Sequence, residues 1–202
     1  MTDRRTEIVA AALEVFAERG YRGGSLAAVA ERVGLTQQGV LHYFPSKDAL
    51  LTDVLRLRDM LDGPDPGAET AAADSTASGG TGPDSSGPGG LAGIEALVAR
   101  NAARPGLVQC FTVLAGESVT DQHPAREFFT ARYRALRPRL VGLLRAELGD
   151  PGPSGLTAEQ ASALLIAVMD GLQQQWLLEP GAVDMPGLVS AFARVLRDQP
   201  AG

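Results

Sequence analysis

Residues 63–90 constrain the fold more than any other part of the chain, because they contain almost nothing from which a hydrophobic core can be built. The segment GPDPGAETAAADSTASGGTGPDSSGPGG has no Val, Ile, Leu, Met or aromatic residue, and its 28 residues include eight glycines and four prolines. Such a segment buries too little apolar surface to offset the entropy lost when its backbone is ordered. We predict a disordered, acidic Gly/Pro/Ser-rich linker at 63–90, with an acidic interaction segment as the alternative.

The net charge of the chain is concentrated around this linker. Residues 61–90 contain five acidic and no basic side chains, whereas residues 1–60 contain eight of each. Residues 91–202 contain ten basic and eleven acidic side chains. The formal charge of −6 therefore does not argue against nucleic-acid binding by the N-terminal part.

Several function classes are disfavoured by what the sequence lacks. Cys110 is the single cysteine and the two histidines stand 81 positions apart, so no disulfide framework and no multi-cysteine zinc site is expected. We recognise no convergent nucleophile, base or metal set, and we expect no catalytic residues, no metal site, no cofactor and no enzyme. The N-terminus lacks the apolar run of a signal peptide, and no apolar stretch reaches membrane-spanning length. We therefore expect a cytoplasmic protein without a membrane partner.

Apolar residues on the N-terminal side of the linker recur at helical spacing. The first predicted helix ends at Gly20, where a left-handed cap is expected. A second helix is predicted from Ser25 to Gly34 and a short third one from Thr36 to Phe44, and a fourth follows directly. A helix, a tight glycine turn and a short helix form the signature of a helix-turn-helix, here preceded by a stabilising first helix.

Residues 4–58 resemble the DNA-binding domain of the TetR family of one-component transcriptional regulators. The residues that carry the resemblance are IVAAALEVFAERGYRGGSLAAVAERVGLTQQGVLHYFPSKDALL. The resemblance implies an all-α fold with an N-terminal helix-turn-helix, three-helix DNA-binding domain at 1–48 and a connecting helix at 49–62. It also implies a C-terminal helical ligand-binding and dimerisation domain at 91–202.

The third predicted helix carries the polar side chains that base recognition requires at the N-terminal end of a helix. Gln37 and Gln38 have amides suited to adenine, and Gly39 lets the backbone approach a base. Lys47, the single lysine, is expected to contact phosphate from the first turn of the next helix; a solvated surface lysine is the alternative. The predicted DNA-binding residues are Ser25, Thr36, Gln37, Gln38, Gly39, His42, Tyr43 and Lys47.

Other side chains in this region are expected to stabilise the domain. Val40 and Phe44 have the spacing of a face that packs on the first helix, so we predict that they belong to the core. Tyr43 is predicted to contact phosphate, with a partly buried packing role as the alternative. Ser25 is expected to cap its helix alone, because Ala28 stands where many family members have an acid.

Residues 91–202 are predicted to form five further helices. The stretch 107–119 is apolar nearly all round and could form a buried strand, but its helical surroundings favour a buried helix. The resemblance implies that the last two helices pair with their mates in a four-helix dimer interface. The expected interface residues are Leu165, Val168, Leu172, Leu188, Phe192 and Val195.

The resemblance also implies that the remaining C-terminal helices enclose an effector cavity. Effector pockets are mostly apolar with a few polar groups, and Glu117 within an apolar helix is the strongest indication of one. Ordinary core packing is the alternative for each apolar candidate. The predicted effector-binding residues are Cys110, Phe111, Leu114, Glu117, Phe128, Tyr133, Met169, Gln173 and Trp176.

These patterns lead to one functional hypothesis with an alternative. The chain is expected to bind double-stranded DNA at a pseudo-palindromic operator as a homodimer, and to regulate transcription as a repressor released by a small, largely apolar ligand. The alternative is a DNA-binding dimer without a small-molecule effector, which abundance or a protein partner regulates. A helical interaction domain that has lost DNA binding is disfavoured, because Thr36, Gln37, Gln38 and Lys47 are all present.

Overall fold

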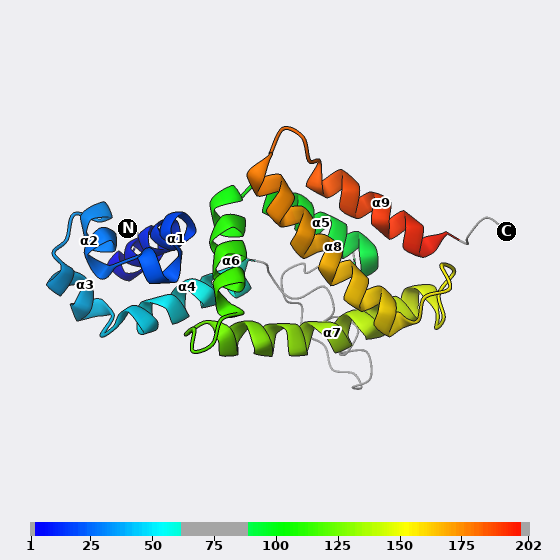
Figure 1. Cartoon of the computed structure of the whole chain (residues 1–202), viewed down its shortest axis with the longest axis horizontal. Helices are drawn as coiled ribbons and strands as arrows, with labels where there is room; N and C mark the ends of the chain where they lie inside the picture. The colour runs from blue at the N-terminus through cyan, green and yellow to red at the C-terminus, as the bar shows by residue number, and fades with distance from the viewer. Residues whose placement is uncertain (1–2, 62–88, 199–202) are drawn as a thin grey trace, which may run out of the picture. The chain divides into compact units, whose positions relative to one another are not determined.

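A computed structural model of the protein describes residues 3–61 and 89–198, and the side chains of residues 58–61 are not described. Every regular element within these ranges is a helix, which confirms the all-α prediction (Figure 1). The predicted linker falls almost entirely outside the described residues. The helices are α1 (Arg4–Gly23), α2 (Leu26–Arg32), α3 (Gln37–Tyr43), α4 (Lys47–Leu61), α5 (Gly90–Ala102), α6 (Pro105–Ser118), α7 (Arg126–Leu148), α8 (Ala158–Leu178) and α9 (Met185–Arg197).

The described residues form two compact units. The first unit contains α1 to α4, α6 and the start of α7 up to Arg132. The second unit contains α5, the rest of α7 from Tyr133, α8 and α9. The division differs from the domain boundary predicted at residue 91, because the segment Arg104–Arg132 groups with the N-terminal helices.

α1 is interrupted near its end by a glycine with a left-handed backbone. Gly20 has φ 65° and ψ 179°, which confirms the positive φ expected there, although helical turns continue to Gly23. This combination of angles is accessible essentially only to glycine. A β-carbon at Gly20 would also lie 2.1 Å from Oε1 of Glu117 on α6. The turn therefore requires glycine both for its backbone conformation and for the approach of α6.

The core of the first unit is shared by all its helices. The buried face of α1 includes Ile8, Val15 and Phe16, all of them fully buried. α6 contributes Leu107, Cys110, Phe111 and Leu114 to the same cluster, so the apolar stretch 107–119 forms the buried helix that was predicted. Pro105 begins this helix at a position where its missing N–H costs nothing. The other large members of the cluster are Val9, Tyr21, Val29, Val40, Phe44, Leu50, Leu51, Val54, Leu55 and Phe129.

The second unit has its own core, to which α5, α7, α8 and α9 contribute. Its largest cluster contains Leu91, Ile94, Leu140, Leu143, Leu144, Leu165, Ile166 and Leu196.

One predicted dimer-interface residue belongs to that core. Leu165 is fully buried within a single chain, so the prediction that it contributes to a dimer surface is wrong. Its neighbour Leu164 is 44% exposed and lies four residues before Val168, so Leu164 rather than Leu165 continues the stripe of Val168 and Leu172. Leu188 and Val195 on α9, also predicted for the interface, are 45% and 59% exposed.

Within residues 3–61 and 89–198, no helix is both long and apolar enough to cross a membrane.

We predict that alanine at Gly20 will destabilise the protein more than alanine at Gly34. Both glycines have positive φ, but nothing lies within 4 Å of a β-carbon at Gly34, so that variant measures the cost of a left-handed alanine, about 1–2 kcal/mol. Gly20→Ala adds a more restricted backbone region, about 1–3 kcal/mol, and must displace the Glu117 carboxylate. Urea unfolding of both variants tests this order, and equal losses would contradict the proposed close approach.

Candidate nucleic-acid interface

The helix-turn-helix is built by two side-chain caps and one glycine turn. The hydroxyl of Ser25 accepts the N–H of Ala28 at 3.1 Å and begins α2, as expected for a cap without an acidic partner. Gly34, with φ 64°, ends that helix in the left-handed region. The hydroxyl of Thr36 then accepts the N–H of Gly39 at 3.1 Å and begins α3. The chain thus places a short helix after a tight turn, as the sequence predicted.

α3 separates its apolar from its polar residues cleanly. Val40 and Phe44 are 0% and 1% exposed, so the prediction that both are core residues is confirmed. Gly39 and Leu41 are half-buried. The polar residues around this helix are exposed, and they are Thr36, Gln37, Gln38, His42 and Tyr43.

Tyr43 was predicted to contact phosphate, with a partly buried packing role as the alternative. Its side chain is 36% exposed, and its ring meets that of His42 edge-on with the centroids 5.5 Å apart. The exposure leaves the phenol accessible beside the exposed amides of α3. Its contact with phosphate stays a prediction.

Two arginines at the start of α1 lie beside the helix-turn-helix and were not singled out from the sequence. Arg4 donates to the carbonyl of Val33 at 3.2 Å, just before the glycine turn. Arg5 donates to the carbonyl of Tyr43 at 3.4 Å, and its guanidinium lies 4.4 Å from the centre of the Phe44 ring. Arg4 and Arg5 therefore hold the start of the glycine turn and the end of α3. The adjacent pair of arginines near the N-terminus is the sequence feature that could have indicated this role.

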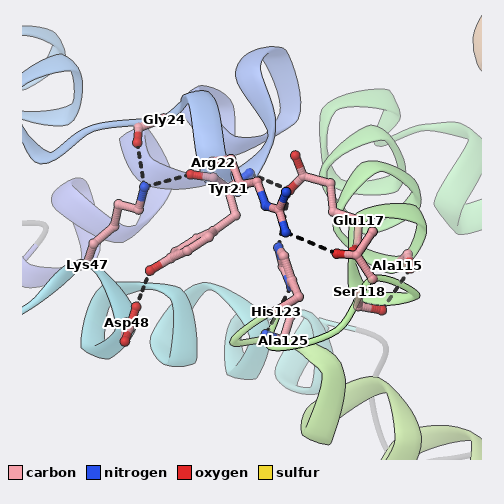
Figure 2. Close-up of polar contacts among 11 residues, drawn as sticks. Tyr21, Arg22, Gly24, Lys47, Asp48, Ala115, Glu117, Ser118, His123 and Ala125 are labelled. Atoms are coloured by element: carbon pink, nitrogen blue, oxygen red, sulfur yellow. Dashed lines mark hydrogen bonds and ion pairs between the residues drawn. The ribbon is translucent and has the colours of Figure 1, made fainter.

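Lys47 is already engaged within the protein (Figure 2). Its ammonium donates to the carbonyls of Tyr21 and Gly24 at 2.7 and 2.8 Å, and it lies 4.1 Å from the centre of the Tyr21 ring. Burial lowers the pKa of the ammonium from its ordinary value, and the nearby carboxylates of Asp48 and Glu117 oppose that shift. Lys47 is therefore a half-buried structural residue, not the freely solvated lysine considered as the alternative. Its contact with phosphate stays a prediction.

The side chain of Tyr21 contacts Asp48, Phe16 and His123. Its hydroxyl donates to the carboxylate of Asp48, and its ring packs against those of Phe16 and His123, with centroids 5.8 and 5.4 Å away. Burial, followed by the hydrogen bond to Asp48, raises the pKa of the phenol above its ordinary value. Tyr21 thus remains a neutral donor, and its ring packs in the core of the first unit.

Glu117 connects α6 to the end of α1. One carboxylate oxygen, Oε2, accepts the backbone N–H of Tyr21 at 2.7 Å (Figure 2). The same oxygen lies 3.3 Å from Nε2 of His123, without the alignment of a hydrogen bond. The other ring nitrogen of His123 accepts the N–H of Ala125 at 3.2 Å, so a neutral ring carries its proton on Nε2, facing Glu117. Glu117 is thus occupied by protein groups, whereas the sequence suggested a ligand-binding role.

Two further hydrogen bonds join α6 and its following loop to α1. Gln109 donates to the carbonyl of Ala17 at 3.2 Å, and Arg22 donates to the hydroxyl of Thr120 at 3.3 Å. Together with the bond to Glu117, they join the last two turns of α1 to most of the length of α6. The helix that precedes the helix-turn-helix is therefore attached to α6, which begins about 60 residues after α3 ends.

The predicted effector-binding residues are distributed over both units. Five of them lie in the first unit, where Cys110, Phe111 and Leu114 are buried in the core that α1 shares. Of those in the second unit, Tyr133 donates to Asp170 at 2.6 Å. Their binding role stays a prediction. The remaining members are Glu117 and Phe128 in the first unit, and Met169, Gln173 and Trp176 in the second.

We predict that Glu117→Ala will lower the free energy of unfolding by about 1–3 kcal/mol, because the half-buried N–H of Tyr21 loses its acceptor. Glu117→Gln keeps an oxygen at the same place and is expected to lose less. Urea unfolding of the two variants measures the difference. If glutamine proves as harmful as alanine, the negative charge rather than the hydrogen bond stabilises this contact.

For Lys47, we predict that alanine will lower the thermal midpoint, because two carbonyls at the end of α1 lose a charged donor, worth about 1.5–3 kcal/mol each at most. Arg56→Ala is the matched control, since this cation lies on the same helix with its side chain 70% exposed. Calorimetry should show a clear loss for Lys47→Ala and almost none for the control. Equal thermal midpoints for the two variants would contradict the structural role of Lys47.

Two family models match the chain. The model of the bacterial regulatory proteins of the tetR family matches residues 8–54, which contain the helix-turn-helix. The model of the C-terminal part of BetI-type transcriptional repressors matches residues 91–199. The two matches leave out little more than the first seven residues and the predicted linker with its flanks.

Individual proteins agree with these matches. The transcriptional regulator RutR of Escherichia coli K12 is 42% identical over 53 residues, which are 26% of this chain and 25% of RutR. The alignment thus spans about a quarter of that relative. FadR of Bacillus subtilis, solved with stearoyl-CoA, has a TM-score of 0.67 at 16% identity, over 97% of this chain and 99% of its own.

A transcriptional regulator of Saccharomonospora viridis, solved with choline, has a TM-score of 0.64 at 18% identity, over 94% of this chain and 93% of its own. Identities this low establish the fold alone, whereas the C-terminal family model by itself covers more than half of the chain. The proteins of this family are regulators of transcription and not enzymes, in agreement with the expectation from the sequence. The chain belongs to the TetR family of transcriptional regulators.

Proposed function

We propose that the protein is a transcriptional repressor that binds a pseudo-palindromic operator as a homodimer in the bacterial cytoplasm, and that a small, largely apolar molecule releases it. The observation that carries the DNA-binding part is the exposed polar face of α3, set at the end of a capped glycine turn. A helix presented in this way can enter the major groove with its N-terminal residues at the base edges.

Each predicted DNA-binding residue has a chemical role in the proposal. The amides of Gln37 and Gln38 pair with adenine, and Gly39 leaves room for the backbone of α3 to approach a base. His42 and Tyr43 contact phosphates one turn further along. The predicted DNA contact of Ser25 and Thr36 is with phosphate, since their hydroxyl oxygens already accept backbone N–H groups and can still donate.

Lys47 keeps a place in this scheme despite its internal hydrogen bonds. An ammonium has three donors, and two of them point to carbonyls of the same domain. The third is available for a phosphate oxygen. We therefore propose that Lys47 stabilises the domain first and contributes to DNA affinity second, without reading sequence.

Dimerisation is proposed to use the exposed apolar residues of α8 and α9. Leu164, Leu188 and Val195 are each more than 40% exposed, and Leu178 is 78% exposed. Apolar residues exposed in this number on neighbouring helices favour burial against a second copy. Val168, Leu172 and Phe192 are half-buried and can extend the same surface.

Release by a ligand is supported by the attachment of α6 to α1. The same helix carries four predicted effector-binding residues, and one of them, Glu117, has the carboxylate that accepts the N–H of Tyr21. A ligand that changes the position of α6 would therefore act on the helix-turn-helix. The stearoyl-CoA and choline bound to the two structural neighbours support a small-molecule effector in general, without naming one for this chain. The alternative, regulation by abundance or a protein partner, needs no such ligand.

Binding to DNA from the region upstream of the protein's own gene tests this function. We predict that affinity falls steeply as salt rises, and that Gln38→Ala costs about 1–3 kcal/mol and relaxes the preference at one base position. Gln174→Ala is the control, because this glutamine is exposed on α8, away from α3 in the sequence. A gel shift with single-base operator variants measures both effects. Equal affinity for operator and unrelated DNA would contradict the proposal.

A further inference from the structure

A buried amide in the second unit has no hydrogen-bond partner for its oxygen. Asn101, in the last turn of α5, is 3% exposed, and its Oδ1 accepts no hydrogen bond from any described residue. Buried side-chain oxygens in proteins nearly always have a donor, from the protein or from ordered water. An exception in a core position therefore calls for a donor that the described residues do not supply.

Two other residues have a buried polar atom without a partner among the described residues, but each has a simpler explanation. Nε2 of His123 lies 3.3 Å from the carboxylate of Glu117 and needs only a small reorientation to bond with it. Thr112 is half-buried, and a threonine hydroxyl on a helix can rotate toward a backbone carbonyl one turn before it. Neither explanation applies to Asn101, because its side chain is buried and no donor among the described residues reaches its Oδ1.

One turn before Asn101, α5 contributes to a small apolar cluster with α9. Val98 lies three residues earlier on the same face of α5, and it belongs to a small cluster with Met185 and Val189 of α9. Side chains from α8 pack against this cluster while remaining partly exposed. They are Met169, Leu172 and Trp176.

Among residues 3–61 and 89–198, the cluster is thus only partly covered on its α8 side. Methionine is flexible and polarizable, and it fills irregular gaps or adapts to a bound molecule more readily than a branched residue. A second copy of the chain could cover the partly exposed residues. It could not supply a donor to Asn101, because that side chain is already buried within a single chain.

We propose that Asn101 is the polar group of a ligand site among α5, α8 and α9, and that the ligand is an apolar molecule with one hydroxyl or N–H group that donates to Oδ1. This inference rests on the proposed release by a ligand, and it specifies the chemical class of that ligand. A site of one acceptor within an apolar lining selects for a donor strongly, because a ligand without one leaves the buried oxygen unpaired. None of the effector-binding residues predicted from the sequence supplies this acceptor.

Two isomers of the same formula provide the probe. 1-Octanol has a hydroxyl that can donate, whereas 1-methoxyheptane has the same atoms and an ether oxygen that cannot. Trp176, the single tryptophan, belongs to the cluster and reports binding through its fluorescence. We expect 1-octanol to bind the full-length protein at least about tenfold more tightly than the ether, which corresponds to about 1.4 kcal/mol.

The variant Asn101→Leu tests whether the amide of Asn101 causes the difference in affinity between the two isomers. It has nearly the same volume without the acceptor, so it is expected to bind the two isomers equally and to unfold at a higher temperature than the unmodified chain. Ser162→Ala is the matched control. Ser162 is 1% exposed on α8, but its hydroxyl already donates to the carbonyl of Arg137 at 3.3 Å. This control should keep the full preference for 1-octanol.

Equal binding of the two isomers to the unmodified protein, or no binding of either, would overturn the inference whatever happens to the variant. A preference that survives in Asn101→Leu would overturn it as well. The release function is measured separately, by adding 1-octanol to the protein–operator complex. If the fluorescence preference is present but the complex persists, the ligand site stands and its role in release fails.

Discussion

The hydrogen bond from the backbone N–H of Tyr21 to the carboxylate of Glu117 determines how the first unit is assembled. The left-handed turn at Gly20 breaks the helical bonding of α1, and it leaves backbone groups near the end of the helix that need partners from elsewhere. α6 supplies the acceptor through Glu117, and α4 supplies the donor through Lys47. One irregular turn thus fixes three helices around the residue that follows it, Tyr21.

The helices themselves could be predicted because their signals are local. Ser25 and Thr36 cap the helices that they precede, and Pro105 and Pro186 stand in the first turns of α6 and α9. The apolar stretch that becomes α6 was ambiguous between strand and helix, and only its helical neighbours resolved it. Periodicity and caps act over one or two turns, which is the range that a single sequence makes visible.

The roles of polar residues were less predictable, because their partners are remote in the sequence. Glu117 and Tyr21 are 96 residues apart, and Lys47 lies 26 residues from Tyr21. A charge in an apolar helix indicated that Glu117 is special, but it could not distinguish a ligand from a backbone N–H as its partner. The prediction for Leu165 was wrong for a similar reason. Spacing identifies an apolar stripe on α8, but it does not show which edge of that stripe packs in the core of the same chain.

The same contact limits what a ligand can achieve. A ligand changes DNA affinity only by its difference in affinity for the two arrangements of the protein, so some interaction must differ between them. A charge-assisted hydrogen bond such as that of Glu117 is worth about 1.5–3 kcal/mol. Its loss on ligand binding would change an equilibrium by roughly ten- to a hundredfold. That range is sufficient for a regulator, and because α6 also packs its apolar face against α1, the bond could break without unfolding the domain.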